Sequence, residues 1–477
     1  MLAFIVAFAL ACGVNAYATP RVPQITVTTG VLQGLSSGAT GTEAAFLGIP
    51  YAAPPVGDLR WQPPQPPAAW VGTRSATRYA PACPQLPAKW LPYPAWSEDC
   101  LYLNVWTSQT SPQARLPVIV YFHGGSNQAG YSQLTPLGSA LSPLGVVVVT
   151  VNYRLGPLGF LALPALTAES PHHASGNYGL LDQIAALGWV RENIARFGGN
   201  SGRITVMGQS AGAVDICLLM TSALARGLFQ QAIMQSGDCQ ATLNEDIRTS
   251  QAGKRLAADL GIGSGPQVLR TLRTIPVDVI LKAWRDDQTL RFGAIVDGWV
   301  VPDQPARIFA QGRQARIPIL AGSNADEATV FGPGSGSAAE YQRYLQRQSD
   351  AFAYGAVSMG RVMTRAGQPA WLYRLTWAES GPRSRLGAYH GEELSFLGNA
   401  FPEDWGSRSG DRAFGATLRQ YWTNFAKTGN PNGAGLPAWP AYDAHTHQIQ
   451  ELGEQIQSVD ACRIRHRGIR WRGPCSW

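Results

Sequence analysis

The stretch Arg203-Ile204-Thr205-Val206-Met207-Gly208-Gln209-Ser210-Ala211-Gly212 decides the fold of this chain. Its first five residues have strand character, a Gly-x-Ser-x-Gly turn follows, and a helix-compatible run begins at Ala213. This order predicts a nucleophile elbow, a strained turn that holds the hydroxyl of Ser210 above the carboxyl edge of a sheet. Gly208 and Gly212 carry no side chains to obstruct the strand and helix packed alongside. The amide of Ala211 is expected to face the same point, at the positive end of the helix.

Length and composition place the chain among globular proteins with a large core. Its 477 residues are long for an average domain but suit a single α/β domain with insertions. Hydrophobic residues make up 45% of the chain and charged residues 14%, which allows extensive burial. Basic residues exceed acidic ones by 38 to 31, and the arginines are scattered except at the very end. No nucleic-acid partner is therefore expected.

The N-terminus is typical of a secretory signal peptide. Residues 2–14 form an apolar core, and Ala16-Tyr17-Ala18 supplies the small residues of a cleavage site. The apolar core is too short to span a bilayer. The sequence therefore predicts a signal peptide over residues 1–18 and one exported domain over residues 19–477, secreted or periplasmic. Lipidation at Cys12 is the alternative.

The cysteines also favour export. Removal of the signal peptide leaves six: Cys83, Cys100, Cys217, Cys239, Cys462 and Cys475. An even number in an exported chain indicates disulfides, although six cysteines allow fifteen connectivities. Cys83 and Cys100 close a short Pro-rich loop, and Cys462 and Cys475 are suited to pinning the C-terminus. Cys217 and Cys239 then remain as a pair by elimination. No Cys-x-x-Cys spacing suggests zinc, and no metal is predicted.

Apolar runs that alternate with helical patterns predict the architecture. Residues 116–122 are apolar throughout, and residues 146–151 are valines apart from Thr150; such runs are typical of central strands covered on both faces. A helical pattern over residues 180–197 precedes the strand that ends in the elbow. The alternation predicts an α/β protein with a doubly wound, mostly parallel sheet. Residues 245–312 are expected to form a helical insertion, and residues 332–337 a lid hinge.

Candidate catalytic partners for Ser210 follow other predicted strands at the same edge of the sheet. Glu327 directly follows one strand, and His390 lies on a loop just past another. The chain order of serine, acid and histidine is the order that this class of sheet uses. We expect His390 to be the general base for Ser210 and Glu327 to hold the imidazole in one tautomer. Asp238, just past the preceding strand, is the alternative acid.

A glycine turn supplies candidate donors for an oxyanion. His123-Gly124-Gly125-Ser126 follows the apolar strand over residues 116–122. Glycines allow a loop to approach a reacting centre closely, so backbone amides can point to where negative charge develops. The Ala211 amide adds to this set. His123 is expected to brace the loop, and an ordinary tight turn is the alternative interpretation of the two glycines.

Several motifs spread along the chain carry a family resemblance. They are Phe46-Leu47-Gly48-Ile49-Pro50-Tyr51-Ala52 with Pro54-Pro55, Ser97-Glu98-Asp99-Cys100-Leu101-Tyr102-Leu103-Asn104-Val105, Asn152-Tyr153-Arg154, Phe197-Gly198-Gly199-Asn200, Gly208-Gln209-Ser210-Ala211-Gly212 and Trp422-Thr423-Asn424-Phe425-Ala426-Lys427-Thr428-Gly429-Asn430-Pro431-Asn432. Together they resemble the type-B carboxylesterase family, which includes the cholinesterases. The resemblance runs from about residue 24 to residue 445.

The resemblance implies an α/β-hydrolase fold and assigns roles to individual residues. It implies a Ser-Glu-His triad that matches Ser210, Glu327 and His390. The implied oxyanion donors are the amides of Gly125, Ser126 and Ala211. The resemblance also implies a disulfide between Cys83 and Cys100 and a buried pair of Glu98 with Arg154.

Three features depart from the family pattern. Ser126 stands where a third glycine is usual, and its side chain restricts the loop. Gln209 replaces the acid that cholinesterases carry beside the nucleophile. The segment from Glu327 to His390 is shorter than usual, so the helical insertions are expected to form a reduced lid over a shallower site. The Arg-rich tail over residues 462–477 is not a recognised family feature.

These observations predict an exported serine carboxylesterase that works through an acyl-enzyme on Ser210, without a cofactor, on a small-molecule ester. A lipase or an amidase-type hydrolase on the same triad is an alternative, and so is a non-catalytic cholinesterase-like binding protein. Choline esters are disfavoured because Gln209 carries no charge, although Trp90 offers a ring on which a quaternary ammonium can stack. No membrane span is expected, and the oligomeric state is not predicted.

Overall fold

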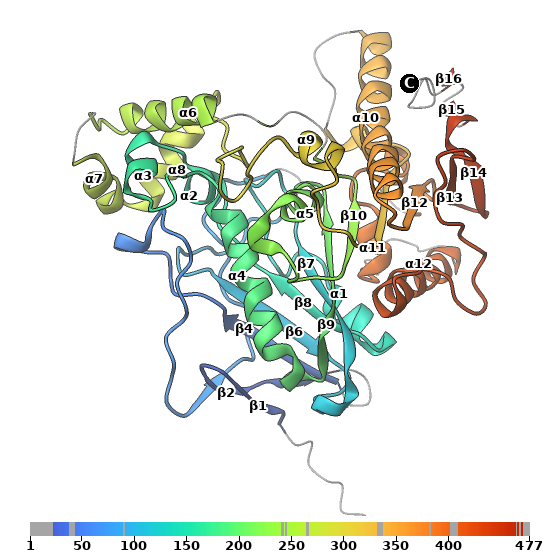
Figure 1. Cartoon of the computed structure of the whole chain (residues 1–477), viewed down its shortest axis with the longest axis horizontal. Helices are drawn as coiled ribbons and strands as arrows, with labels where there is room; N and C mark the ends of the chain where they lie inside the picture. Colours follow the sequence, from blue (N-terminus) through green and yellow to red (C-terminus); the bar gives the residue numbers. More distant parts are fainter. Residues whose placement is uncertain are drawn as a thin grey trace, which may run out of the picture.

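A computed structural model shows an 11-stranded sheet with helices on both faces (Figure 1). The structure describes residues 22–37, 43–88, 91–239, 243, 246–263, 267–331, 337–380, 383–400, 409–463, 465–466 and 469–470. The expected signal peptide, all but the last residue of the expected hinge over residues 332–337, Trp90 and Cys475 therefore lie outside the described residues. So does most of the Arg-rich tail.

The sheet runs in the order β14-β13-β12-β11-β10-β9-β7-β8-β6-β4-β3. Its strands are β3 (Leu35–Ser37), β4 (Glu43–Pro50), β6 (Tyr102–Thr107), β7 (Leu116–Phe122), β8 (Val147–Val151), β9 (Gly199–Gln209), β10 (Gln231–Gln235), β11 (Ile319–Asn324), β12 (Ala370–Leu375), β13 (Gln448–Leu452) and β14 (Ile456–Asp460). The strands from β8 to β13 pair in parallel, whereas β6, β4, β3 and β14 add antiparallel pairs at the two sides. The predicted α/β-hydrolase fold with a mostly parallel sheet is confirmed.

Two small sheets lie outside the main one. β1 (Gln24–Val27), β2 (Gly30–Gln33) and β5 (Thr73–Ser75) form the first, and β15 (Arg465–His466) pairs with β16 (Ile469–Arg470) in the second. β1 and β2 form an antiparallel hairpin with its turn at residues 28–29. That turn has glycine at residue 30 with φ of 148°.

The helices follow the alternation read from the sequence. They are α1 (Leu137–Leu141), α2 (Gly156–Phe160), α3 (Pro164–Glu169), α4 (Tyr178–Asn193), α5 (Ala211–Thr221), α6 (Asp246–Asp259), α7 (Val268–Thr274), α8 (Val277–Asp286), α9 (Pro305–Ala310), α10 (Ala338–Arg365), α11 (Glu393–Leu397) and α12 (Ser409–Thr428). The expected helical insertion over residues 245–312 is formed by α6 to α9, and α6, α7 and α8 lie beside α2 and α3 (Figure 1).

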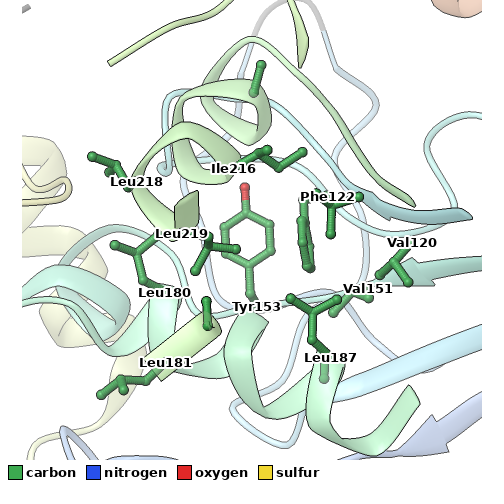
Figure 2. Packing of buried hydrophobic residues seen from close by; sticks show 14 of the residues in the cluster. Val120, Phe122, Val151, Tyr153, Leu180, Leu181, Leu187, Ile216, Leu218 and Leu219 are labelled. Carbon is green, nitrogen blue, oxygen red and sulfur yellow. The ribbon is translucent and has the colours of Figure 1, made fainter. Parts of the chain in front are cut away.

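Alternate residues of each central strand face two separate cores, as the side-chain period of a strand requires. In β7, Val118, Val120 and Phe122 belong to the larger core, whereas Ile119 and Tyr121 belong to the smaller one. α4 and α5 cover the larger core, and Figure 2 shows their leucines and isoleucine packed around Tyr153 and the strand side chains. α1, α11 and α12 cover the smaller core. Burial on both faces explains the apolar runs seen in the sequence.

The implied pair of Glu98 with Arg154 is wrong, because each residue has a different partner. Arg60 donates to both carboxylate oxygens of Glu98, at 2.7 and 2.6 Å. The guanidinium of Arg154 forms a bidentate pair with Asp182 at 2.8 and 2.7 Å, and its backbone amide donates to the same carboxylate. Asp182 is fully buried on α4, so its negative charge requires a positive partner. Because Arg154 supplies that partner, its guanidinium is not paired with Glu98.

Two disulfides join cysteines that both lie among the described residues. Cys83 and Cys100 are joined with Cα atoms 5.0 Å apart, and Cys217 on α5 is joined to Cys239 with Cα atoms 5.6 Å apart. The second bond ties the helix behind Ser210 to the segment after β10. Because Cys475 lies outside the described residues, its pairing with Cys462 stays a prediction. In the part of the chain that the structure describes, no helix is both long and apolar enough to cross a bilayer.

Candidate active site

Ser210 occupies a strained turn between β9 and α5. Its φ of 56° and ψ of −124° put a non-glycine residue in a conformation that side chains rarely adopt. A Cβ added to Gly208 would lie 2.5 Å from the carbonyl oxygen of Gly212, and one added to Gly212 would lie 2.2 Å from that of Phe122. Both neighbours are backbone, which cannot move aside. The two flanking glycines are therefore required sterically.

His390 meets Glu327 beside this turn. The His390 Nδ1 lies 2.5 Å from Glu327 Oε2, and Glu327 is fully buried with its other oxygen accepting from the Asn324 amide at 2.7 Å. Burial by itself would lower the pKa of His390, but the charge and hydrogen bond of Glu327 outweigh it, so the pKa is raised. Glu327 thereby selects the tautomer in which His390 carries its proton on Nδ1.

The alternative acid, Asp238, occupies a different environment. A Cβ added to Gly355 of α10 would lie 1.9 Å from an Asp238 carboxylate oxygen, so this carboxylate packs against α10. The ring nitrogen of His390 that a triad acid orients is already taken by Glu327. The geometry therefore favours Glu327 over Asp238.

The second nitrogen of His390 contacts Gln209. The His390 Nε2 lies 3.2 Å from Gln209 Nε2, and among the described residues no hydrogen bond joins Ser210 Oγ to the imidazole. Since Nδ1 carries the proton, the Nε2 lone pair accepts from the Gln209 amide. The sequence suggested only that Gln209 is an uncharged neighbour of the nucleophile. It did not indicate that the amide reaches the base.

The glycine loop lies directly against Ser210. A Cβ added to Gly124 would lie 3.0 Å from the Ser210 Cβ, and one added to Gly125, whose φ is 112°, would lie 1.8 Å from the Ala129 carbonyl oxygen. Ser126 has a φ of 58°, so serine adopts here the left-handed conformation that glycine would adopt freely. Within the described ranges, no protein acceptor is found for the amides of Gly125, Ser126 and Ala211. These donors are available to a substrate oxygen.

His123 braces this loop, as expected. Its Nδ1 lies 2.8 Å from the Gly124 carbonyl oxygen, and its ring stacks on Tyr153 with centroids 4.4 Å apart. Burial lowers its pKa to about 4, so the imidazole stays neutral in the core. An imidazole with so low a pKa is a weak base, and its Nδ1 is already engaged with the loop, so His390 is the better candidate base for Ser210.

A pocket of about 300 Å³ opens above Ser210 and His390. Much of its lining is apolar: Leu91, Leu134, Pro136, Val330, Phe331 and Leu394. Of its described lining residues, Arg383 is the one with a permanent charge, and its Nη1 lies 3.5 Å from the Tyr389 hydroxyl. The described residues hold no cluster of three or more His, Cys, Asp or Glu suited to a metal ion.

Buried carboxyl groups support the loop that carries His390. Glu393 accepts from the side-chain amides of Asn324 at 2.6 Å and Gln235 at 3.1 Å, and Glu392 accepts from the Glu379 backbone amide at 2.5 Å. Burial first, and neighbouring carboxylates second, raise the pKa of Glu393 to about 7. Burial also raises the pKa of Glu392 to about 9. This cluster was not predicted from the sequence, although the two adjacent acids directly after His390-Gly391 were a signal for it.

Comparisons with known proteins identify the family of the chain. The family model described as "Carboxylesterase family" matches residues 21–351 and 335–467. The chain is 36% identical over 475 residues to the fumonisin B1 esterase of Sphingopyxis macrogoltabida, covering 90% of this chain and 87% of that protein. It is 36% identical over 460 residues to the para-nitrobenzyl esterase of Bacillus subtilis (strain 168), covering 86% and 91%. A solved PNB esterase superposes with a TM-score of 0.81 at 32% identity, over 92% of this chain and 97% of that one.

Proposed function

The chain belongs to the carboxylesterase family, whose members named above are serine carboxylic ester hydrolases, and from this premise we propose an exported carboxylesterase with Ser210 as its nucleophile. Glu327 and His390 complete the proposed triad. The observation that carries the proposal is the 2.5 Å contact between His390 and the buried Glu327, beside a strained serine at the floor of a pocket.

In the first proposed step, Ser210 Oγ attacks the ester carbonyl carbon while His390 Nε2 accepts the hydroxyl proton. For this transfer the Gln209 amide must move away from His390 Nε2, because in the structure its Nε2 lies 3.2 Å from that atom and donates to its lone pair. The carbonyl oxygen becomes an oxyanion that accepts from the amides of Gly125, Ser126 and Ala211. The tetrahedral centre then collapses, the C–O bond to the alcohol breaks, and His390 returns the proton to the leaving alkoxide.

In the second proposed step, water replaces the alcohol. His390 takes a proton from the water as its oxygen attacks the acyl carbon, and the same amides hold the second oxyanion. Collapse of this intermediate breaks the bond to Ser210 Oγ, which regains its proton from His390. The net reaction consumes one water and releases one carboxylic acid and one alcohol. Glu327 stabilises the imidazolium in both steps without itself becoming protonated.

The pocket favours uncharged or anionic esters over choline esters. Its apolar side chains offer contacts to an acyl chain or an alcohol group. The guanidinium of Arg383 on the pocket wall repels a quaternary ammonium, and Gln209 supplies no negative charge to attract one. A lipase or amidase activity on the same triad remains an alternative within the class of serine hydrolases.

The test combines covalent labelling with a panel of nitrophenyl esters of increasing acyl length. We expect Ser210→Ala to lose at least about 10³-fold of kcat and all labelling by a fluorophosphonate probe, whereas Ser111→Ala, an exposed control, keeps both. Labelling of the wild-type chain should map to Ser210. If the wild-type chain is neither labelled nor active, the binding-protein alternative gains support instead.

Export is proposed from the sequence of residues 1–18 and is supported by the two disulfides. The mature N-terminus expected after cleavage is Thr19. Intact mass of the protein recovered from a secreting host, compared with the full-length mass, tests this. A mass that retains residues 1–18 would contradict it.

A further inference from the structure

Two consecutive residues of the oxyanion loop hold left-handed conformations. Ser126 has a φ of 58° and Asn127 a φ of 57°, and neither is a glycine. Such residues persist only where surrounding contacts impose the conformation. The amides of Gln128 and Ala129 donate to the Gly125 carbonyl oxygen at 2.9 and 3.0 Å, which closes a turn around the two residues. The side chain of Asn127 adds contacts that tie this turn to the core.

The side chain of Asn127 is anchored in the core. Its Nδ2 donates to Asp215 Oδ1 at 2.9 Å, and its Oδ1 lies 3.3 Å from the Tyr153 hydroxyl oxygen. Its backbone carbonyl accepts from the Gly156 amide at 2.7 Å. Tyr153 also donates to the His123 carbonyl oxygen at 2.6 Å, which ties the start of the same loop to this network.

Asp215 is the centre of the anchor. It is fully buried on α5, the helix that begins directly after Ser210. Its second oxygen accepts from Gln183 Nε2 of α4 at 2.7 Å. Both hydrogen bonds come from amide groups that can only donate through nitrogen, so a carboxylate fits the position and an amide would not. Burial raises the pKa of Asp215 to about 7, which reflects the cost of keeping a carboxylate there.

We propose that Asp215 is a positioning residue that locks the oxyanion loop to the helix carrying the nucleophile. The proposal rests on the proposed esterase function. Through Asn127, Asp215 keeps Ser126 in its left-handed conformation, so that the amides of Gly125 and Ser126 stay aimed at the oxygen that develops charge next to Ser210. One helix thus sets the distance between the attacking oxygen and the donors, which electrostatic stabilisation requires to be held in advance.

The primary test is Asp215→Asn. An asparagine can satisfy only one of the two amides that now donate to Asp215, so the loop should lose its anchor. We expect kcat for a nitrophenyl ester to fall about 10- to 100-fold, while KM changes less than about threefold. The affinity for a trifluoromethyl ketone, which forms an oxyanion on the serine, should fall by the same factor as kcat.

A second substitution separates positioning from a general structural role. Glycine adopts a positive φ without strain, so Ser126→Gly should restore at least about threefold of kcat and of ketone affinity in the Asp215→Asn background. The exposed control Ser111→Ala should leave kcat and ketone affinity unchanged. If Asp215→Asn fails to fold, Asn127→Ala attacks the same hydrogen bond from the loop and should give the same parallel losses.

The outcomes are distinguishable. Wild-type kcat in Asp215→Asn, a kcat loss without a matching loss of ketone affinity, or the absence of any rescue by Ser126→Gly would each overturn the proposal. In all three cases the proposed function stands, provided that Ser210→Ala remains inactive. An inactive wild-type chain that also fails to bind the ketone would instead overturn the proposed function.

Discussion

The elbow that carries Ser210 and the loop that carries His390 are held in place by opposite means. The elbow is confined by steric exclusion, because the Cβ atoms absent from Gly208 and Gly212 leave just enough room for backbone. The His390 loop is held by polar contacts from elsewhere in the chain: Glu327 at the ring, Asn324 and Gln235 at Glu393, and the Glu379 amide at Glu392.

The difference teaches where each half of the site is sensitive. Close packing of backbone tolerates no added atom, so the elbow should fail abruptly on a small substitution. A loop held by buried carboxyl groups should respond to charge and pH instead, since burial and neighbouring charges decide whether those groups ionise. Gln209 joins the two regions, because it belongs to the elbow and contacts the base.

The largest effect is expected where the steric confinement is broken. Gly212→Ala would place its Cβ 2.2 Å from the carbonyl oxygen of Phe122, the residue before the oxyanion loop. We expect at least about a 100-fold loss of kcat/KM, because the nucleophile and the loop are pushed apart, and a loss of stability of about 1–3 kcal/mol. Nitrophenyl ester kinetics and thermal unfolding measure the two effects.

Gly188→Ala is the matched control, because a Cβ at Gly188 of α4 meets nothing within 4 Å. Its activity should be unchanged and its stability should rise by about 0.5–1 kcal/mol, as for glycine replaced by alanine inside a helix. Equal activity of the two alanine variants would refute the idea that close packing limits the elbow.

The contact between the two regions can be broken by charge. In Gln209→Glu, a carboxylate would replace the amide 3.2 Å from His390 Nε2 and favour a proton on that nitrogen. The pKa of His390, already raised by Glu327, should rise further. We expect the acid limb of the pH profile of kcat/KM to shift to higher pH by about one unit. At pH values below the wild-type limb, kcat/KM of the variant should therefore be about tenfold lower than that of the wild type.

Gln209→Met serves as the uncharged control for this experiment. It removes the amide donor without adding a charge, so the acid limb should stay close to its wild-type position. An unmoved limb in Gln209→Glu would show that the resting contact between Gln209 and His390 does not persist in the active enzyme.

The smallest effect concerns the buried carboxyl groups. Burial raises the pKa of Glu392 from 4.5 to about 9, so the folded protein binds a proton at this group that the unfolded chain releases. The contribution of the Glu392 proton to the free energy of unfolding is therefore complete below about pH 4.5, and it is lost as the pH rises toward about 9. The Glu392→Gln variant has no group that titrates at this position. Between pH 6 and pH 9 its melting temperature should therefore fall less than that of the wild type, and the two falls should differ by about 2 °C.

Glu192→Gln, on the exposed face of α4, is the control and should follow the wild-type pH dependence. Circular dichroism melts at matched ionic strength give the comparison. A wild-type melting temperature that does not change over this range would rule out a retained proton on Glu392.

Much of the fold was predictable because its signals are local. The apolar run over residues 116–122 became β7 without any shift, and the helical pattern over residues 180–197 became α4 with a short 3₁₀ turn. The apolar character before Glu327 begins at Ile317, but β11 begins only at Ile319, after Pro318, which has no amide for the ladder. Periodicity and turn residues are sufficient for such elements, but their ends depend on pairing.

Contacts between distant residues were harder to predict. Family resemblance paired Glu98 with Arg154, yet each found another partner across the fold. The Gln209 contact, the Asp215 anchor and the carboxyl cluster under His390 depend on which polar groups are buried together. A single sequence does not contain that information, because hydrogen-bond partners are set by the packing of separate elements.

The sequence by itself determined the α/β-hydrolase architecture and the positions along the chain where chemistry is expected, Ser210, Glu327 and His390. The reason is that strand periodicity, glycine turns and chain order act over a few residues at a time. The tertiary structure alone decided that His390 Nδ1 faces Glu327 and that its Nε2 faces Gln209. It also decided that a buried Asp215 holds the oxyanion loop, because burial gives each polar contact its partner and its energetic weight.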